Sequence, residues 1–134
     1  MLQERKQLTD VWKDGEIESN LEYAILTNEI YKTWSGMTAK EYKEFKGLRK
    51  ENLRDNMDNI ELILTDLSEE ATKLIAKEKN PKGLKENIKV ARDGGNVAKI
   101  ARDDLEQKVD KKVISSDNRL NYEYLKDVEK IENK

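Results

Sequence analysis

The segment that most constrains the fold is residues 58–78, where apolar residues recur at steps of three and four. Since an α-helix turns once in about 3.6 residues, this spacing places them on one helix face. Asp58 and Glu61 open the segment with a capping box, in which each side chain takes a backbone N–H that the first turn leaves unpaired. We therefore expect a central helix over residues 58–78 that buries this face against other helices. The face comprises Ile60, Ile63, Leu64, Leu67, Ala71, Leu74 and Ile75.

Helix starts and stops recur along the rest of the chain. Thr38 and Glu41 form a second capping box just after Gly36, a residue suited to the left-handed conformation that ends a helix. Asn80-Pro81 stops the central helix, because the residue before a proline is pushed out of helical backbone. These signals predict further helices over residues 1–14, 19–34, 38–47, 84–92, 96–109 and 116–131, with a helical turn or two in 48–57 and a brief extended piece at 113–114.

Two interruptions shape this pattern. We interpret Asp93-Gly94-Gly95 as a turn between helices that needs positive φ, rather than as a phosphate loop, since no strand precedes it and no lysine-serine pair follows it. Thr27-Asn28 is predicted to kink or break the helix over 19–34. The expected inward-facing residues are Leu21, Ala24, Ile25, Tyr31 and Trp34 in that helix, and Val97, Ile100, Ala101, Leu105 and Val109 in the helix over 96–109.

Together these signals predict an all-α fold, a compact bundle of about five to seven helices in one domain over residues 1–134. We expect loosely held ends at 1–5 and 118–134. Hydrophobic residues make up 36% and charged residues 40%, so the core is modest and the surface densely charged. A net charge of −2 gives no overall attraction to nucleic acid or to acidic membranes. No apolar run approaches the roughly 20 residues of a membrane span, and no signal peptide is visible.

Side chains for catalysis are scarce. The chain has neither histidine nor cysteine, so it lacks the usual proton-transfer residue, thiolate chemistry and disulfides. The densest acidic positions, Asp55 with Asp58 and Asp103 with Asp104 and Glu106, are better explained as helix starts or a charged face than as a metal site. We expect no enzyme activity, no cofactor and no metal.

Binding is the remaining class of function. Aromatic and arginine side chains dominate interface energetics, so the candidate anchors for a protein partner are Tyr31, Trp34, Tyr42, Arg49 and Arg54. Core packing is an equally good explanation for Trp34 and Tyr42. Leu26 and Leu62 fall off the main apolar faces, which leaves homodimerisation open, through them or through the last helix.

Nucleic-acid binding is the alternative. Two segments, Lys40–Arg54 and Lys82–Arg102, are rich in basic residues and could form one patch if they meet in space. A solvated charged face is the competing interpretation. The candidate phosphate contacts are Lys43, Lys46, Lys50, Lys85, Lys89 and Arg92.

Several short motifs within residues 5–118 resemble those of a known group of proteins. They are Trp34-Ser35-Gly36-Met37, Tyr42-Lys43, residues 51–57 (ENLRDNM), and Gly94-Gly95 with Ala98, Ala101-Arg102 and Glu106. With these motifs the chain resembles the C-terminal region of prophage proteins that carry an N-terminal BRO-type domain, grouped with antirepressors and DNA-damage-inducible protein D. It departs from that pattern at Asp110, where we expect glycine in the family.

The resemblance implies a phage or mobile-element origin and a regulatory role through protein contacts in the cytoplasm of a bacterial host. In that family the BRO-type domain is the part associated with DNA binding, and this chain has none, so DNA binding is not carried over. The sequence therefore predicts a phage-type interaction module that binds and modulates a host or phage protein. One version is an inhibitor of a host defence nuclease, similar to an anti-CRISPR protein.

Overall fold

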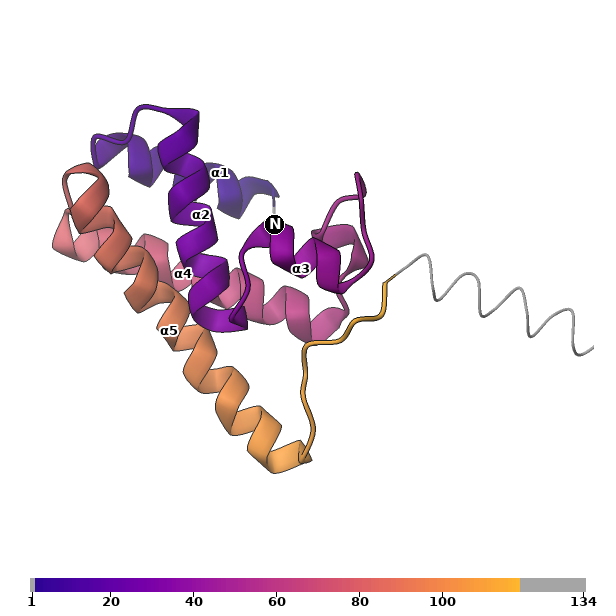
Figure 1. The fold of residues 1–134 in the computed structure, drawn as a ribbon. Helices are drawn as coiled ribbons and strands as arrows, with labels where there is room; N and C mark the ends of the chain where they lie inside the picture. The colour runs from indigo at the N-terminus through magenta and orange to yellow at the C-terminus, as the bar shows by residue number, and fades with distance from the viewer. Residues whose placement is uncertain (1, 119–134) are drawn as a thin grey trace, which may run out of the picture.

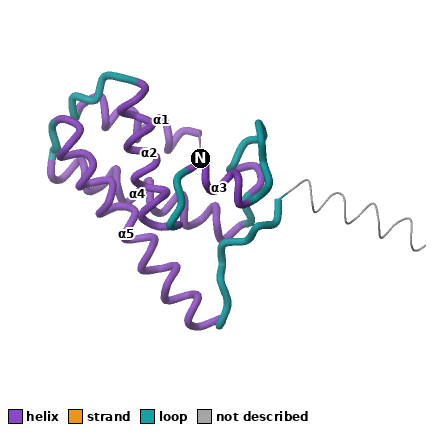
Figure 2. Tube along the Cα trace, viewed as in Figure 1, coloured by secondary structure: helices purple, strands orange, loops and turns teal. Residues whose placement is uncertain are grey.

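The computed structural model describes the backbone of residues 2–118 and the side chains of residues 8–118. This part of the chain is all-helical and has no strand, which confirms the predicted fold class (Figures 1 and 2). The elements, in chain order, are α1 (Leu2–Asp14), α2 (Asn20–Ser35), α3 (Ala39–Phe45), the 3-10 turn η1 (Arg54–Asn56), α4 (Asn59–Lys79) and α5 (Gly83–Val109). Of these helices, none combines the length and apolarity that a bilayer crossing requires.

Three of the predicted helix starts, those near residues 19, 38 and 58, are confirmed in detail. Complete capping boxes open α3, from Thr38 and Glu41, and α4, from Asp58 and Glu61. A third capping box, formed by Ser19 and Glu22, opens α2. Gly36 ends α2 with a φ of 82°, in the left-handed region that glycine tolerates without strain. Local sequence chemistry therefore fixes the boundaries of these helices.

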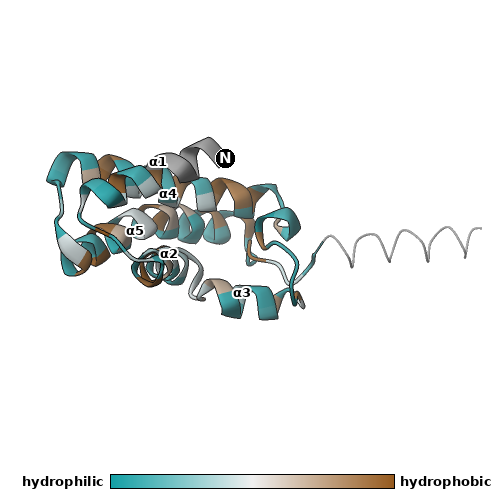
Figure 3. Ribbon diagram, turned by 90° about the horizontal axis from the view of Figure 1, so that it is seen from above, coloured by the Kyte–Doolittle hydropathy of each residue, from teal (hydrophilic) through white to brown (hydrophobic). Residues whose placement is uncertain are grey.

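The longest helix, α5, holds the bundle together. It packs against α4 on one side and α2 on the other, as Figure 3 shows from above, while α1 lies on α4 and α3 on α2. After α5 the chain returns along residues 110–118, here called the strap, to the corner where α3 and η1 meet the start of α4 (Figure 1). Asp110 begins the strap in the left-handed conformation, with a φ of 56°.

The prediction of a turn at Asp93-Gly94-Gly95 was wrong, because α5 runs through it without a break. Both glycines serve close packing instead of positive φ. A Cβ on Gly94 would lie 1.9 Å from Thr72 Oγ1 and 2.7 Å from Thr72 Cα, and a Cβ on Gly95 would lie 2.7 Å from Thr33 Cβ. The two glycines thus let α5 approach α4 and α2 at backbone distance.

The buried faces of three helices also differ from the predicted ones. In α2, which is continuous through Thr27-Asn28, the off-face residues Leu26 and Ile30 are buried while Leu21 is exposed. In α5, Val97 and Ile100 are exposed because Gly94, Gly95 and Ala98 make the contacts. In α4 the buried face is turned by roughly a third of a turn from the predicted apolar face.

The turn between α1 and α2 is tied to the turn between α4 and α5. The Gly83 N–H donates to the Gly15 carbonyl at 2.8 Å, and the side-chain amide of Asn87 donates to the same oxygen at 3.2 Å. Lys82 Nζ also donates to the Asp14 carbonyl at 2.8 Å. These bonds fasten the end of α1 to the start of α5. The predicted last helix, through Leu120 and Ile131, lies outside the described residues.

Candidate functional site

The inward face of α4 is polar. Thr65, Ser68 and Thr72 are buried on it, and each hydroxyl donates to a carbonyl one turn earlier in the same helix, at 2.6–2.8 Å. Because these side chains are short and satisfy their own hydrogen bonds, the neighbouring helices can pack closely against them. The full buried set on α4 is Glu61, Leu64, Thr65, Ser68, Glu69, Thr72, Lys73 and Ala76.

A buried ion pair, Lys46 with Glu61, lies at the start of this face. Lys46 Nζ is 2.9 Å from Glu61 Oε1, and the Tyr42 hydroxyl donates to the other carboxylate oxygen. Lys46 Nζ also donates to the Ser115 and Asp117 carbonyls of the strap, both at 2.7 Å. All three ammonium protons therefore have acceptors, and the strap is fastened to α3 and α4.

The environment of this pair changes its acid–base properties. Burial raises the pKa of Glu61 above its ordinary value, and the hydrogen bonds from Tyr42 and Lys46 offset only part of that shift. Burial and the bond to Glu61 also raise the pKa of Tyr42, so its hydroxyl remains protonated and acts as the donor. The network is thus a structural clasp with every strong donor in use.

A second charge cluster occurs further along α4. The Arg54 guanidinium, from η1, bonds to Glu69 through Nη2 and lies 3.3 Å from Asp66 Oδ1 through Nη1. Burial lowers the pKa of Arg54, but the charge of Glu69, the hydrogen bond to it and the interaction with Tyr31 together outweigh burial, and the net shift is upward. One guanidinium is thus shared between two carboxylates.

The outward edge of α4 is apolar. Ile63 is 60% exposed and Leu74 is 63% exposed, although both belong to the face that was predicted to be buried. They are eleven residues apart, which is about three helical turns, so they share one edge of the helix. Ile60 and Leu67 lie on the same edge and are half-buried. We call these four residues the outer edge of α4.

The structure places the predicted partner anchors mostly in the core. Tyr31, Trp34 and Tyr42 are buried, with the Tyr42 ring centroid 6.3 Å from that of Tyr31 and 6.1 Å from that of Trp34. Arg54 is engaged in the cluster described above, and only Arg49 is exposed. The five residues therefore do not form a surface. Of the two leucines proposed for a homodimer, Leu26 is fully buried and Leu62 packs against the core.

The predicted basic residues do not form one patch. Lys85, Lys89 and Arg92 are exposed on the first half of α5, whereas Lys43 and Lys50 lie in and after α3, at the opposite end of the molecule (Figures 1 and 3). Arg92 Nε is also 2.6 Å from Glu29 Oε1 of α2. The sixth candidate, Lys46, is buried in the clasp and has no surface for a phosphate contact.

The acidic positions have structural partners. Asp58 caps α4, and Glu106 accepts from Arg102 Nε and from the Val113 N–H of the strap, both at 3.0 Å. Among the described residues, no three acidic side chains are arranged to hold a metal ion.

Two features of the site were missed at the sequence level. The outer edge of α4 was assigned to the core, and Lys46 was assigned to the surface. A signal for the polar face was present, because Glu61, Thr65, Ser68 and Thr72 recur with the same helical spacing as the apolar residues. The Gly94-Gly95 pair was the matching signal in α5, because glycine lets that helix pack closely against the polar face of α4. No local pattern marks Lys46 as buried.

Comparisons of this chain with protein-family models, curated proteins and solved structures found no match.

Proposed function

We propose that this chain is a protein-interaction module that binds a host or phage protein through the outer edge of α4 and modulates its activity. The proposal rests on one observation: two large aliphatic side chains, Ile63 and Leu74, stand exposed on the same edge of a helix whose inward face is polar. Burying an aliphatic side chain of this size contributes about 1.5–3 kcal/mol. A partner that covers the edge gains part of this contribution for each residue, since both side chains are already partly buried.

The surroundings of the edge fit a binding surface. Lys77 and Glu78 are exposed on the last turns of α4, beside Leu74. An apolar centre with a charged rim is the usual anatomy of a protein interface. The phage or mobile-element origin, and the version in which the partner is a host defence nuclease, are supported by the resemblance in sequence alone.

The test is a capture experiment with the tagged chain and a lysate of the native host. The double variant Ile63→Glu, Leu74→Glu should lose a partner that the wild-type chain retains. The control is Leu21→Glu, because Leu21 is 71% exposed but lies on α2, away from this edge. Circular dichroism checks that both variants fold, and a solution mass tests whether the captured protein is a second copy of the chain.

Two results contradict the proposal. One is a set of captured proteins that is the same for the wild-type chain and for the double variant. The other is tight, sequence-specific DNA binding without any protein partner. If nucleic acid binds through Lys85, Lys89 and Arg92, the affinity falls steeply with salt and is lost when these residues become glutamate.

A further inference from the structure

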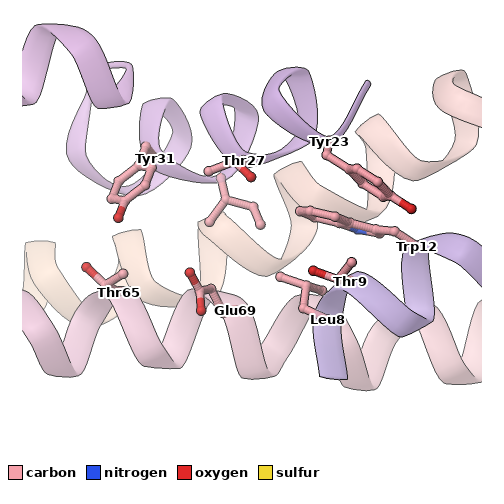
Figure 4. Close-up of a pocket in the computed structure, with 9 residues that line it drawn as sticks. Leu8, Thr9, Trp12, Tyr23, Thr27, Tyr31, Thr65 and Glu69 are labelled. Atoms are coloured by element: carbon pink, nitrogen blue, oxygen red, sulfur yellow. The ribbon is translucent and has the colours of Figure 1, made fainter. Parts of the chain in front are cut away.

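The helices that cover α4 leave its outer edge free. Thr65 and Glu69 each follow a residue of this edge by two positions, which places them about 200° further around the helix. On that side α1 and α2 pack over α4 around a small cavity, and Figure 4 shows Thr65 and Glu69 facing α2. Ile63 and Leu74 remain exposed on the other side. The described part of the chain therefore does not cover the outer edge.

The apolar row on this edge has a regular spacing. Its members are separated by steps of four, four and three residues, and Ala71 is half-buried like Leu67. Because such a repeat makes three turns at about 3.67 residues per turn, the row runs nearly straight along the helix for about 16.5 Å. It therefore fits a second helix that carries an apolar row of equal length. The row consists of Ile63, Leu67, Ala71 and Leu74.

Residues 119–131, here called the distal segment, have the same spacing in the sequence. They follow the strap and lie outside the described residues. Their apolar residues are also separated by steps of four, four and three, as expected for the helix that the sequence predicts here. Each comes 57 residues after its counterpart on α4, so the two rows agree in order as well as in length. The row of the distal segment consists of Leu120, Tyr124, Val128 and Ile131.

The strap leads the chain to the first turn of α4. Asn118 donates from its side-chain amide to the Lys46 carbonyl, and Lys46 Nζ bonds to Glu61 in that turn. Asp117 and Ile60 line one groove between the strap and the start of α4. These two residues are also 57 positions apart. The offset that relates the two apolar rows is thus already present where the strap meets α4.

We propose that the distal segment forms a helix that packs parallel to α4 along its outer edge, in the register in which the two rows match. Leu120 then lies beside Ile63, and Val128 fills the space next to the small Ala71. A helix of about three turns is marginal on its own in water, so the docked and released forms have comparable populations. The distal segment competes with a protein partner for this edge, a point that rests on the proposed function.

Because the chain has no cysteine, a nitroxide spin label can be attached at a single introduced position. Asn133→Cys places the label two residues beyond Ile131, on the outward side of the proposed helix. The docked label should broaden the methyl NMR signals of Leu74. Those of Val109 should stay sharp, because Val109 ends α5, which extends about 40 Å from the turn after α4. Spin-labelled chain mixed with isotope-labelled chain should show no broadening, since the contact lies within one chain.

Two tyrosines of the distal segment provide a matched pair of variants. Tyr124 belongs to the apolar row, whereas Tyr122 lies two positions earlier, about 200° around the proposed helix. Tyr124→Glu should reduce the broadening at Leu74 about fivefold or more, because it puts a charge in place of an apolar contact. Tyr122→Glu is the control and should leave the broadening within about twofold of that without the substitution.

Broadening at Leu74 that Tyr124→Glu removes and Tyr122→Glu keeps supports the proposal. Equal broadening at Leu74 and Val109, or none at Leu74, overturns it. Broadening in the mixed sample also overturns it, because a second copy of the chain then covers the edge.

The competition is tested in the capture experiment. With about half of the chains docked, Tyr124→Glu should retain about twofold more of a partner that the double variant Ile63→Glu, Leu74→Glu loses. Equal retention by the wild-type chain and Tyr124→Glu overturns the competition. The two proposals fail separately. Absence of broadening at Leu74 overturns the docking and leaves the proposed function in place, whereas equal capture by the double variant and the wild type contradicts the proposed function and leaves the docking in place.

Discussion

The two sides of α4 reverse the usual arrangement of a surface helix. Its inward face carries Glu61, Thr65, Ser68 and Thr72, while its outer edge exposes Ile63 and Leu74. Surface helices normally bury their apolar stripe and leave charged residues in water. This difference indicates that close packing between helices, and not hydrophobicity alone, determines which face of α4 is buried.

The reason is visible where α4 crosses α5. Gly94 leaves no space for even one carbon beside Thr72, so the contact requires small residues on both helices. Small hydroxyl side chains meet this need because they bond to their own helix. Ile63 and Leu74 lie outside this contact, on the outer edge of the helix.

The largest expected effect comes from breaking the clasp on the inward face. Lys46→Ala leaves the Glu61 carboxylate buried without its charged partner, which should lower the free energy of unfolding by about 3–5 kcal/mol in urea denaturation. The double variant Lys46→Met, Glu61→Leu should recover much of that loss, since it removes both charges. A loss below about 1 kcal/mol for Lys46→Ala would show that the pair is not buried in solution.

Gly94→Ala tests the close approach of α5 to α4. In an exposed helix, replacing glycine by alanine stabilises by about 1 kcal/mol. Here the added carbon meets the backbone of Thr72, so we expect a loss of about 1–3 kcal/mol or more. Thermal unfolding measures the change. Asn96→Ala, at an exposed position of the same helix, is the control and should leave stability unchanged within about 0.5 kcal/mol.

The two predicted capping boxes allow a test of pH dependence. Because burial raises the pKa of Glu61 above its usual 4.5, the folded state holds this proton more tightly than the unfolded state does. Its contribution to stability is complete below pH 4.5 and is lost as the pH rises through the higher folded pKa. The stability of Glu61→Gln relative to the wild type should therefore improve as the pH rises above 4.5.

Glu41 has the same position in the capping box of α3, which is exposed. We expect the opposite pH dependence of stability for this residue. The backbone N–H of Thr38 lowers the pKa of Glu41 below 4.5, so its contribution is present above pH 4.5 and is lost as the pH falls. The loss of stability caused by Glu41→Gln should therefore be smallest at low pH. Urea denaturation between pH 3 and pH 7 compares the two variants, and the same trend in both would contradict the difference in burial.

The smallest effect on stability is expected on the outer edge. Ile63→Ala should change the free energy of unfolding by no more than about 0.5 kcal/mol, because Ile63 is largely exposed. Leu64→Ala, at the adjacent buried position, should cost about 2–5 kcal/mol. Similar losses for the two variants in urea denaturation would place the apolar edge inside the protein, as the sequence pattern had indicated.

The sequence predicted the features of this fold that depend on neighbouring residues. The boxes at Thr38 and Asp58 and the stop at Gly36 are correct because each is complete within a few residues. The glycine pair in α5 was misinterpreted because glycine serves two purposes, positive φ and close packing, and only the partner helix decides between them. Lys46 could not be assigned, since its acceptors in the strap lie 69 and 71 residues further along the chain.

The hydrogen bonds between the turn at Gly15 and the turn at Gly83 also affect the order in which parts of the structure can form during synthesis. Residues 82–87 fasten the end of α1. During synthesis the turn between α1 and α2 therefore cannot form these hydrogen bonds until α4 and the first turn of α5 have left the ribosome. Helix α1 therefore leaves the ribosome well before the residues that fasten its end, which lie almost seventy positions further along the chain.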